Sequence, residues 1–375
     1  MPVDASRQAN PAPLQRIGWL RAISEPRLTT AWTLGDWDRV VRLARRHRLL
    51  ARLAASIQSA GLMPSVPAQV RNHLIAACHQ SLARTRAMLW AIEWLPRALN
   101  YPSFPLVLLK GSAYLGQDLP IAEGRLPSDL DILVPRKNLA EVRFLLRAAG
   151  WVEPPLDDHD LRYYLEWSHE LPPMRHGAHP IELDVHHNIL PPRAGKTLDA
   201  DLLFERLHTS QWAHWQVLSP VDQLLHCASH LFFDSEPRDR VRDLVDMDGL
   251  FRHFGSTPAF WQELPARAAS LKLLEPLALA CHFARAWLDT PIAEDLSSKL
   301  GSEGPDRSRM RWLIPLMSAV LMPTEPDDED SATKKLAMTI VLARYHSHRL
   351  PMRTLVPHLW RKWRLARPQP EDAMA

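Results

Sequence analysis

The sequence has 375 residues, which is longer than one typical domain, so we expect two or three folded units. Its 45 Lys and Arg against 42 Asp and Glu leave a net charge of +3, which argues against the classes of protein that bind nucleic acids or membranes through overall charge. Three widely spaced cysteines, Cys78, Cys227 and Cys281, exclude a disulfide framework and a zinc-binding pattern and favour a reducing compartment. The first residues form no apolar signal segment, and no apolar run reaches the roughly 18 residues of a membrane span. We therefore expect a cytoplasmic protein without a membrane segment.

Helical patterns fill the first hundred residues. Apolar residues recur at intervals of three and four from Trp37 to about Ala60, which predicts an amphipathic helix that ends at Gly61. A second helix is predicted from about Ala68 to Leu99. The arginines of "RLARRHR" are interpreted as a solvated helix face in preference to a site for a polyanion. We expect residues 1–100 to form a helical region.

The hydrophobic period changes in residues 101–218. The stretches "PLVLLKG" and "SDLDILV" read as buried strands, and "HPIELDVHHNIL" alternates strictly between apolar and other residues, as a strand does. Between them, "NLAEVRFLLRAAG" reads as a helix with Gly150 at its end. This pattern predicts a small central sheet with helices packed on it.

Helical patterns resume in residues 219–375. Ser219, followed by Pro220 and Asp222, reads as a helix start. The acidic stretch "EPDDED" is interpreted as a solvated loop. Near the end, "HLWRKWRLARPQP" is interpreted as a docked basic tail in preference to a contact with nucleic acid or an acidic partner. We expect this region to be a helical domain with a basic tail.

Two strands carry carboxylates on one face. Side chains two apart on a strand share a face, so Asp129 and Asp131 project together, as do Glu182, Asp184 and His186. Two like charges about 4 Å apart repel by about 4 kcal/mol at an effective dielectric near 20. A divalent cation removes this repulsion, and hard oxygen donors select Mg²⁺ or Mn²⁺. Three such carboxylates on adjacent strands suit phosphoryl or nucleotidyl transfer with two metals. His186 either orients a carboxylate, contacts substrate, or is a structural histidine.

The turn before the first acidic strand has the composition of a phosphate site. Gly111 and Ser112 follow a buried strand, so their amides and the serine hydroxyl can face a polyphosphate. Lys110 and Arg125 flank the turn and could stabilise the charge of a triphosphate. The alternative for each is a surface ion pair, and the phosphate role is favoured for Arg125, whereas the two possibilities are equal for Lys110.

Two further pairs lie on the helices that follow the sheet. His226 and His230 are four apart and share a helix face, but the stretch between them lacks the glutamate of a zinc protease, so we expect packing near a nucleotide and not a zinc hydrolase. Asp243 and Asp246 are three apart on another predicted helix. Either acid could reach a catalytic cleft or form salt bridges within its helix.

Three stretches together resemble a known family. "LLKGSAYL", "GRLPSDLDILV" and "IELDVHHNI" resemble the uncharacterised nucleotidyltransferase family of the DNA polymerase beta-like nucleotidyltransferase superfamily, and the likeness covers about residues 35–255. The resemblance implies an α+β fold in which a nucleotidyltransferase core with a small mixed sheet is flanked by N-terminal and C-terminal helical regions. The whole chain would be rich in helix.

The resemblance also implies roles for individual residues. Gly111 and Ser112 match the phosphate-facing turn, Asp129 and Asp131 the metal ligands, and Asp184 the third carboxylate. Asp129 lies 18 residues after Gly111, a longer separation than in compact relatives, so the segment between them must form a loop.

The function expected from these features is metal-dependent nucleotidyl transfer. An NMP group would pass from an NTP, with ATP favoured, to a hydroxyl or other nucleophile, with release of pyrophosphate. A small-molecule, peptide or protein acceptor is favoured over a large nucleic acid because the net charge is close to zero. The alternatives are a catalytically idle nucleotide-binding module, similar to the antitoxin of a two-protein system, and an acid/base hydrolase that uses the same carboxylates. The oligomeric state stays open.

Overall fold

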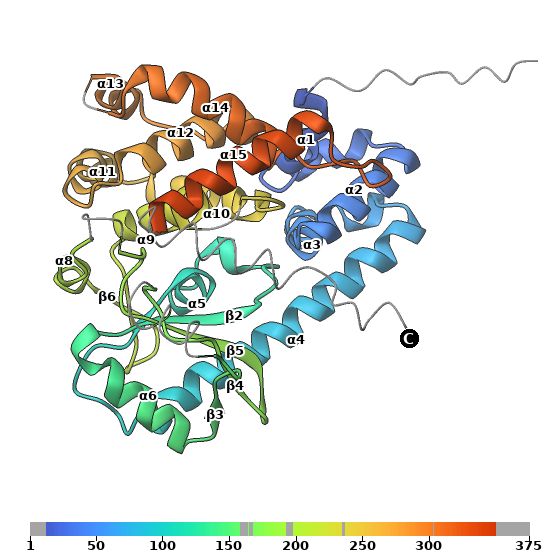
Figure 1. Cartoon of the computed structure of the whole chain (residues 1–375). Helices are drawn as coiled ribbons and strands as arrows, with labels where there is room; N and C mark the ends of the chain where they lie inside the picture. Colours follow the sequence, from blue (N-terminus) through green and yellow to red (C-terminus); the bar gives the residue numbers. More distant parts are fainter. Residues whose placement is uncertain are drawn as a thin grey trace, which may run out of the picture.

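The computed structural model describes residues 13–157, 164, 168–192, 198–234, 237–302 and 304–349. Within them, a mixed sheet is flanked by helices from both ends of the chain, which confirms the helix-rich α+β class (Figure 1). The basic, aromatic stretch after residue 350 lies outside the described residues. None of the described helices is long and apolar enough to cross a membrane.

The N-terminal helices differ in one place from the expected pattern. They are α1 Pro13–Arg21, η1 Pro26–Ala31, α2 Leu34–Arg46, α3 Leu50–Ser59, η2 Met63–Ser65 and α4 Ala68–Ala98. The prediction of one helix from Trp37 to about Ala60 was wrong, because the chain turns at Arg48, whose φ is +57°. The amide of Leu49 there donates to the carbonyl of Ala44 and closes α2. The long helix α4 was predicted within one residue at its C-terminal end.

Within the described residues, the sheet contains seven strands in the order β3-β4-β5-β2-β1-β7-β6. They are β1 Val107–Leu108, β2 Asp129–Leu133, β3 Trp151–Val152, β4 Met174–His176, β5 His179–His186, β6 His208–Thr209 and β7 Gln216–Val217. The central pair, β2 and β5, is parallel, and its register places Asp131 opposite Asp184. The pairs β1–β2 and β4–β5 are antiparallel. The three strands predicted from the sequence are β1, β2 and β5.

Short helices connect the strands and cover the sheet. They are α5 Lys110–Gly116, η3 Pro120–Ala122, η4 Arg136–Asn138, α6 Leu139–Ala148 and α8 Asp201–Phe204. The apolar side chains that alternate with the acids, such as Leu130, Ile132 and Leu183, are fully buried. This burial holds the opposite, acidic face of β2 and β5 in place because a slip of one residue would turn every side chain over.

The C-terminal helices lie against α5 and η3 beside the sheet and against the N-terminal helix α1 (Figure 1). They are α9 Pro220–Ser229, a π-helical turn His230–Asp234, α10 Val241–Phe254, α11 Pro258–Ser270, α12 Leu274–Leu288, α13 Glu294–Ser302, α14 Arg307–Leu321 and α15 Ala332–Arg349. Helix α9 begins as predicted, since the side chain of Ser219 accepts a hydrogen bond from the amide of Asp222.

The acidic stretch 325–330 contacts the N-terminal helices. Glu325 forms a two-bond ion pair with Arg39 of α2, with 2.6 Å between Nη2 and Oε1, and Asp327 pairs with Arg42. The stretch is a loop with exposed acids at 327–329, as interpreted, but Glu325 is an exception because its side chain is only 16% exposed. The division of the chain at residues 100 and 218 stays a prediction.

Candidate metal and nucleotide site

Three carboxylates meet at the centre of the sheet. Asp129 and Asp131 on β2 and Asp184 on the parallel neighbour β5 each offer an oxygen, and these oxygens all lie within 4.8 Å of one another. Asp131 is buried, whereas the other two are partly exposed. The alternation of the two strands thus brings together the three acids selected from the sequence. Oxygen ligands at this spacing suit a hard divalent cation.

The negative charge of this group is only partly balanced. Burial favours the neutral form of Asp131, but Lys110 and His186 outweigh it and hold its pKa well below the ordinary value. Burial and the charges of neighbouring carboxylates, Asp131 first among them, raise the pKa of Asp184 well above the ordinary value. Among the described residues, no hydrogen bond or ion pair of the Asp184 carboxylate is found. The site therefore has an excess of negative charge on the Asp184 side.

Lys110 begins α5 and points to the acids. Its Nζ donates to Oδ1 of Asp131 at 2.8 Å, and its backbone has φ +46°. Burial opposes the charged form, but the attraction of Asp131 and Asp129 raises the pKa of Lys110. In this structure Lys110 is thus a partner of the carboxylates, and the surface ion pair that the sequence left open does not form.

The glycine and serine of the turn have different surroundings. The Ser112 side chain is buried, and its hydroxyl donates to the carbonyls of Leu109, at 2.7 Å, and Asp131, at 3.2 Å. The expectation that this hydroxyl faces a polyphosphate is therefore corrected, because the fold already uses its proton. A Cβ on Gly111 would lie 2.0 Å from Nη1 of Arg125. Only glycine lets this guanidinium approach the turn.

Arg125 belongs to a buried charge network that links three parts of the chain. Its Nε donates to Oδ2 of Asp246 on α10 at 2.9 Å, and Arg52 on α3 donates to Oδ1 of the same carboxylate at 2.9 Å. Burial opposes the charge of both arginines, but the attraction of Asp246 still raises the pKa of Arg125. The guanidinium also lies over the Tyr114 ring, 5.6 Å from its centroid. Asp246 therefore holds Arg125 beside the turn and does not itself join the acidic group.

A glutamate that the sequence reasoning missed lies behind the acids. His186 lies with Nε2 3.1 Å from Oδ1 of Asp131 and Nδ1 3.4 Å from Oε2 of Glu170. Glu170 pairs with His186 through an isolated β-bridge just before β4, in a stretch whose prolines obscure any strand pattern. His186 thus joins Glu170 to Asp131, which supports the interpretation that it orients a carboxylate.

The other predicted site residues lie at different distances from the acids. Glu182 shares their face of β5 but pairs with the exposed Arg175 at 2.5 Å. Asp243 pairs with His230, at 3.5 Å between Oδ2 and Nδ1. Burial and then the charge of Lys110 lower the pKa of both His226 and His230. The charge of Lys110 therefore acts on both histidines.

Comparison with known proteins identifies the family. The family model described as "Uncharacterised nucleotidyltransferase" matches residues 33–289, more than half of the chain. The match extends through α12, beyond residue 255, where the resemblance read from the motifs ended. No curated protein and no solved structure matches the chain. The chain belongs to the uncharacterised nucleotidyltransferase family.

Proposed function

We propose that the protein is a metal-dependent nucleotidyltransferase that transfers an NMP group from an NTP, with ATP as the favoured donor, to a hydroxyl or other nucleophile of a small-molecule, peptide or protein acceptor. The observation that carries this proposal is the meeting of Asp129, Asp131 and Asp184 within 4.8 Å. Membership of a nucleotidyltransferase family supports it. Pyrophosphate would be the second product.

The three acids fit Mg²⁺ or Mn²⁺ as the metal. All donors are hard oxygens, and both hydrogen bonds to the Asp131 side chain go to Oδ1, so its Oδ2 has no partner among the described residues. Burial and the charges of neighbouring carboxylates raise the pKa of Asp184, and a cation at this position would offset both effects. Bound to Asp129, Asp131 and Asp184, a divalent ion would neutralise phosphate charge during transfer.

The remaining residues would bind the donor phosphates and orient the carboxylates. Lys110 and His186 fix the Asp131 carboxylate from two sides. Arg125, held by Asp246 beside Gly111, presents its terminal nitrogens for the phosphates of the donor. Asp184 would take the proton from the acceptor nucleophile. A bond then forms from that nucleophile to the α-phosphorus, and the bond from this phosphorus to the leaving pyrophosphate breaks.

Pyrophosphate release tests this function. The protein is mixed with labelled NTP, Mg²⁺ and cell extract, and the labelled product is identified by mass. We expect release from the wild type and none from the double variant Asp129→Ala/Asp131→Ala. Glu182→Gln is the matched control, because this acid shares the face of Asp184 but pairs with Arg175. Binding of NTP without release would instead identify an idle binding module, and NDP with inorganic phosphate would identify a hydrolase.

A further inference from the structure

A second cluster of potential metal ligands is joined to Asp131. His169, Glu170 and His186 each offer one nitrogen or oxygen atom, and these atoms all lie within 4.8 Å of one another. Both histidines are buried, whereas the side chain of Glu170 is 27% exposed. We call these three residues the histidine group. Its donors are two imidazole nitrogens and one carboxylate oxygen, so it differs in chemistry from the three carboxylates of the candidate metal site.

The pairing of the backbone brings the histidine group together. Glu170 and His186 lie opposite each other in an antiparallel β-bridge. Beside this bridge, the amide of His187 donates to the carbonyl of His169 at 2.8 Å. Residues directly opposite in an antiparallel pair have Cβ atoms about 4.5–5.5 Å apart, so their side chains lie next to each other. The potential ligands therefore meet because the fold places them together.

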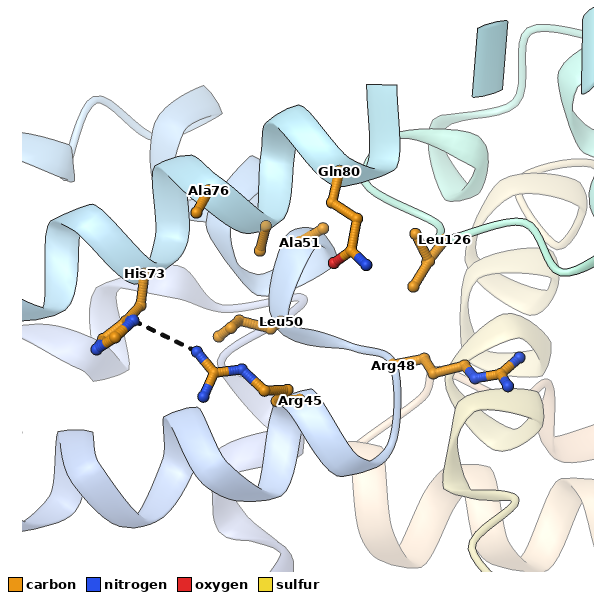
Figure 2. A pocket seen from close by; sticks show the side chains of 9 residues that line it. Arg45, Arg48, Leu50, Ala51, His73, Ala76, Gln80 and Leu126 are labelled. Carbon is orange, nitrogen blue, oxygen red and sulfur yellow. Dashed lines mark hydrogen bonds between the residues drawn. The ribbon is translucent and has the colours of Figure 1, made fainter. Parts of the chain in front are cut away.

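This convergence distinguishes the histidine group from a cavity of about 330 Å³ between α2, α3 and α4. Arg45 and Arg48 line that cavity, are exposed, and form no ion pair with a described carboxylate. Figure 2 shows their guanidinium groups on opposite sides, with that of Arg48 directed away from the cavity. The two charges therefore do not converge on one ligand, and their exposure agrees with the solvated helix face predicted from the sequence.

One ring nitrogen of His186 carries a proton that is directed at Asp131. This nitrogen, Nε2, lies 3.1 Å from Oδ1 of Asp131. The same oxygen accepts a hydrogen bond from the ammonium group of Lys110 at 2.8 Å. An ionised carboxylate can only accept hydrogen bonds, so Nε2 of His186 is the donor. In a neutral imidazole the other nitrogen, Nδ1, then has a lone pair that can bind a metal ion.

The Nδ1 atom of His186 faces an oxygen at a distance that suits a shared metal ion. It lies 3.4 Å from Oε2 of Glu170 and forms no hydrogen bond with a described residue. Two acceptors that face each other repel unless a cation lies between them. A charge-assisted N–H···O hydrogen bond would be about 2.7–2.9 Å long. Two ligands that are each about 2.0–2.1 Å from a tetrahedral zinc ion are about 3.3–3.4 Å apart. The observed separation therefore fits a metal ion better than a shared proton.

The donor atoms select the kind of metal. Imidazole nitrogen suits Zn²⁺, whereas Mg²⁺ and Mn²⁺ prefer oxygen ligands. The second imidazole lies on the same oxygen, because Nε2 of His169 is 4.0 Å from Oε2 of Glu170. Two histidines and one acid provide three ligands of a tetrahedral zinc ion, and water takes the fourth position. The zinc pattern excluded from the sequence concerned cysteines, and the histidine group contains none.

We propose that His169, Glu170 and His186 bind a zinc ion, separate from the Mg²⁺ or Mn²⁺ of the three carboxylates. With Nδ1 on the zinc ion, His186 keeps its Nε2 proton directed at Asp131, and a carboxylate in this position is the usual partner of a zinc-bound histidine. The zinc ion would thereby fix the orientation of Asp131. This inference does not depend on nucleotidyl transfer, because zinc binding is measured without a nucleotide.

The affinity for Zn²⁺ tests the proposal directly. Metal is removed from untagged protein with a chelator, the chelator is dialysed away, and the dissociation constant is measured by competition with a fluorescent zinc indicator. The variants His169→Gln and Glu170→Gln each remove one ligand and keep a polar side chain. We expect each to weaken binding by at least about tenfold, because even the loss of a group that only supports a zinc ligand costs about 10–100-fold.

Two controls separate the histidine group from the other groups nearby. Asp184→Asn removes a carboxylate of the candidate metal site, and His187→Gln replaces a buried histidine outside the group. We expect both to bind Zn²⁺ within about threefold of the wild type, because a residue that is not a ligand acts on the ion only from a longer distance. A large loss of affinity in Asp184→Asn overturns the proposal, since zinc would then lie at the three carboxylates.

Co²⁺ bound to the wild type provides a second measurement that needs no variant. Four-coordinate Co²⁺ absorbs visible light strongly, whereas six-coordinate Co²⁺ on oxygen ligands absorbs weakly, so we expect a strong band. Wild-type protein that binds no Zn²⁺, a weak Co²⁺ band, or unchanged Zn²⁺ affinity in both His169→Gln and Glu170→Gln also overturns the proposal. Zinc binding in a protein that releases no pyrophosphate from NTP would leave the zinc site in place while the proposed function fails.

Discussion

Two buried groups of charges lie on either side of the Gly111 turn, and they are balanced in opposite ways. The acids of the sheet, Asp129, Asp131 and Asp184, have one lysine among them, at Asp131. In the network behind the turn, one carboxylate, Asp246, lies between two arginines, Arg52 and Arg125.

The two groups differ in whether the fold itself supplies an ionic partner for each charge. Each charge of the arginine network has an ionic partner at 2.9 Å, so the network connects α3, the loop before β2 and α10, and it leaves one positive charge in excess beside the turn. Burial and the neighbouring carboxylates raise the pKa of Asp184, and a bound cation would offset both effects. Acids that lie together with too few cations thus indicate a cationic ligand, whereas charges that each have an ionic partner indicate a structural joint. Four predictions test this contrast.

The largest effect is expected at the network. Asp246→Ala leaves two arginines buried without their carboxylate and should lower the free energy of unfolding by about 3–5 kcal/mol, as measured in urea. Replacing all three charges, with Arg52→Met, Asp246→Leu and Arg125→Met, should recover part of this loss, because no uncompensated charge then remains. A loss below about 1 kcal/mol in the free energy of unfolding of Asp246→Ala would mean that the network does not hold α3, the loop before β2 and α10 together.

Asp184 should respond in the opposite way. Without divalent metal, Asp184→Asn should be at least as stable as the wild type, because an uncompensated negative charge is removed. Mg²⁺ at about 100 times its dissociation constant should stabilise the wild type by about 2.7 kcal/mol and leave the variant unchanged. Thermal unfolding with and without Mg²⁺ measures both effects, and Glu182→Gln is the control that keeps the response. A Mg²⁺ response that survives in Asp184→Asn is evidence against this carboxylate as a ligand.

Gly111→Ala should disturb the contact between the Gly111 turn and Arg125, which lies between the acids of the sheet and the arginine network. The new methyl group would lie 2.0 Å from Nη1 of Arg125, which Asp246 holds, so we expect a loss of about 1–3 kcal/mol in the free energy of unfolding and weaker binding of Mg-ATP. Gly18→Ala is the control, because nothing lies within 4 Å of its new methyl group in α1. Equal stability of the two variants would show that Arg125 is free to move.

The smallest expected effect is a difference between the wild type and Asp184→Asn in how the free energy of unfolding changes with pH. The folded-state pKa of Asp184 lies above the ordinary 3.8, so the folded state binds this proton more tightly than the unfolded state. That contribution to stability is fully present below about pH 3.8 and is lost as the pH rises through the raised pKa. Without metal, the stability of Asp184→Asn relative to the wild type should therefore increase with pH. A difference that does not vary with pH contradicts the raised pKa.

The acidic face was predictable because it depends on local periodicity. Asp129 and Asp131 share a face by alternation alone, and strict alternation in "HPIELDVHHNIL" indicated the strand that carries Asp184. The break at Arg48 was missed because the hydrophobic period continues from α2 into α3 while the backbone turns. A periodic pattern records which side chains are buried and does not record a single residue with a positive φ.

The partners of the charges were decided by the tertiary structure. By itself, the sequence determined the helix-rich α+β class, the two acidic strands and the turn before the first of them, because each depends on neighbours a few residues apart. It could not show that Arg125 is held by Asp246 from α10, that Glu170 supports His186, or which arginines of α2 stay unpaired. Some of these contacts join segments more than a hundred residues apart, and only the packing of helices against the sheet brings such residues within reach of one another.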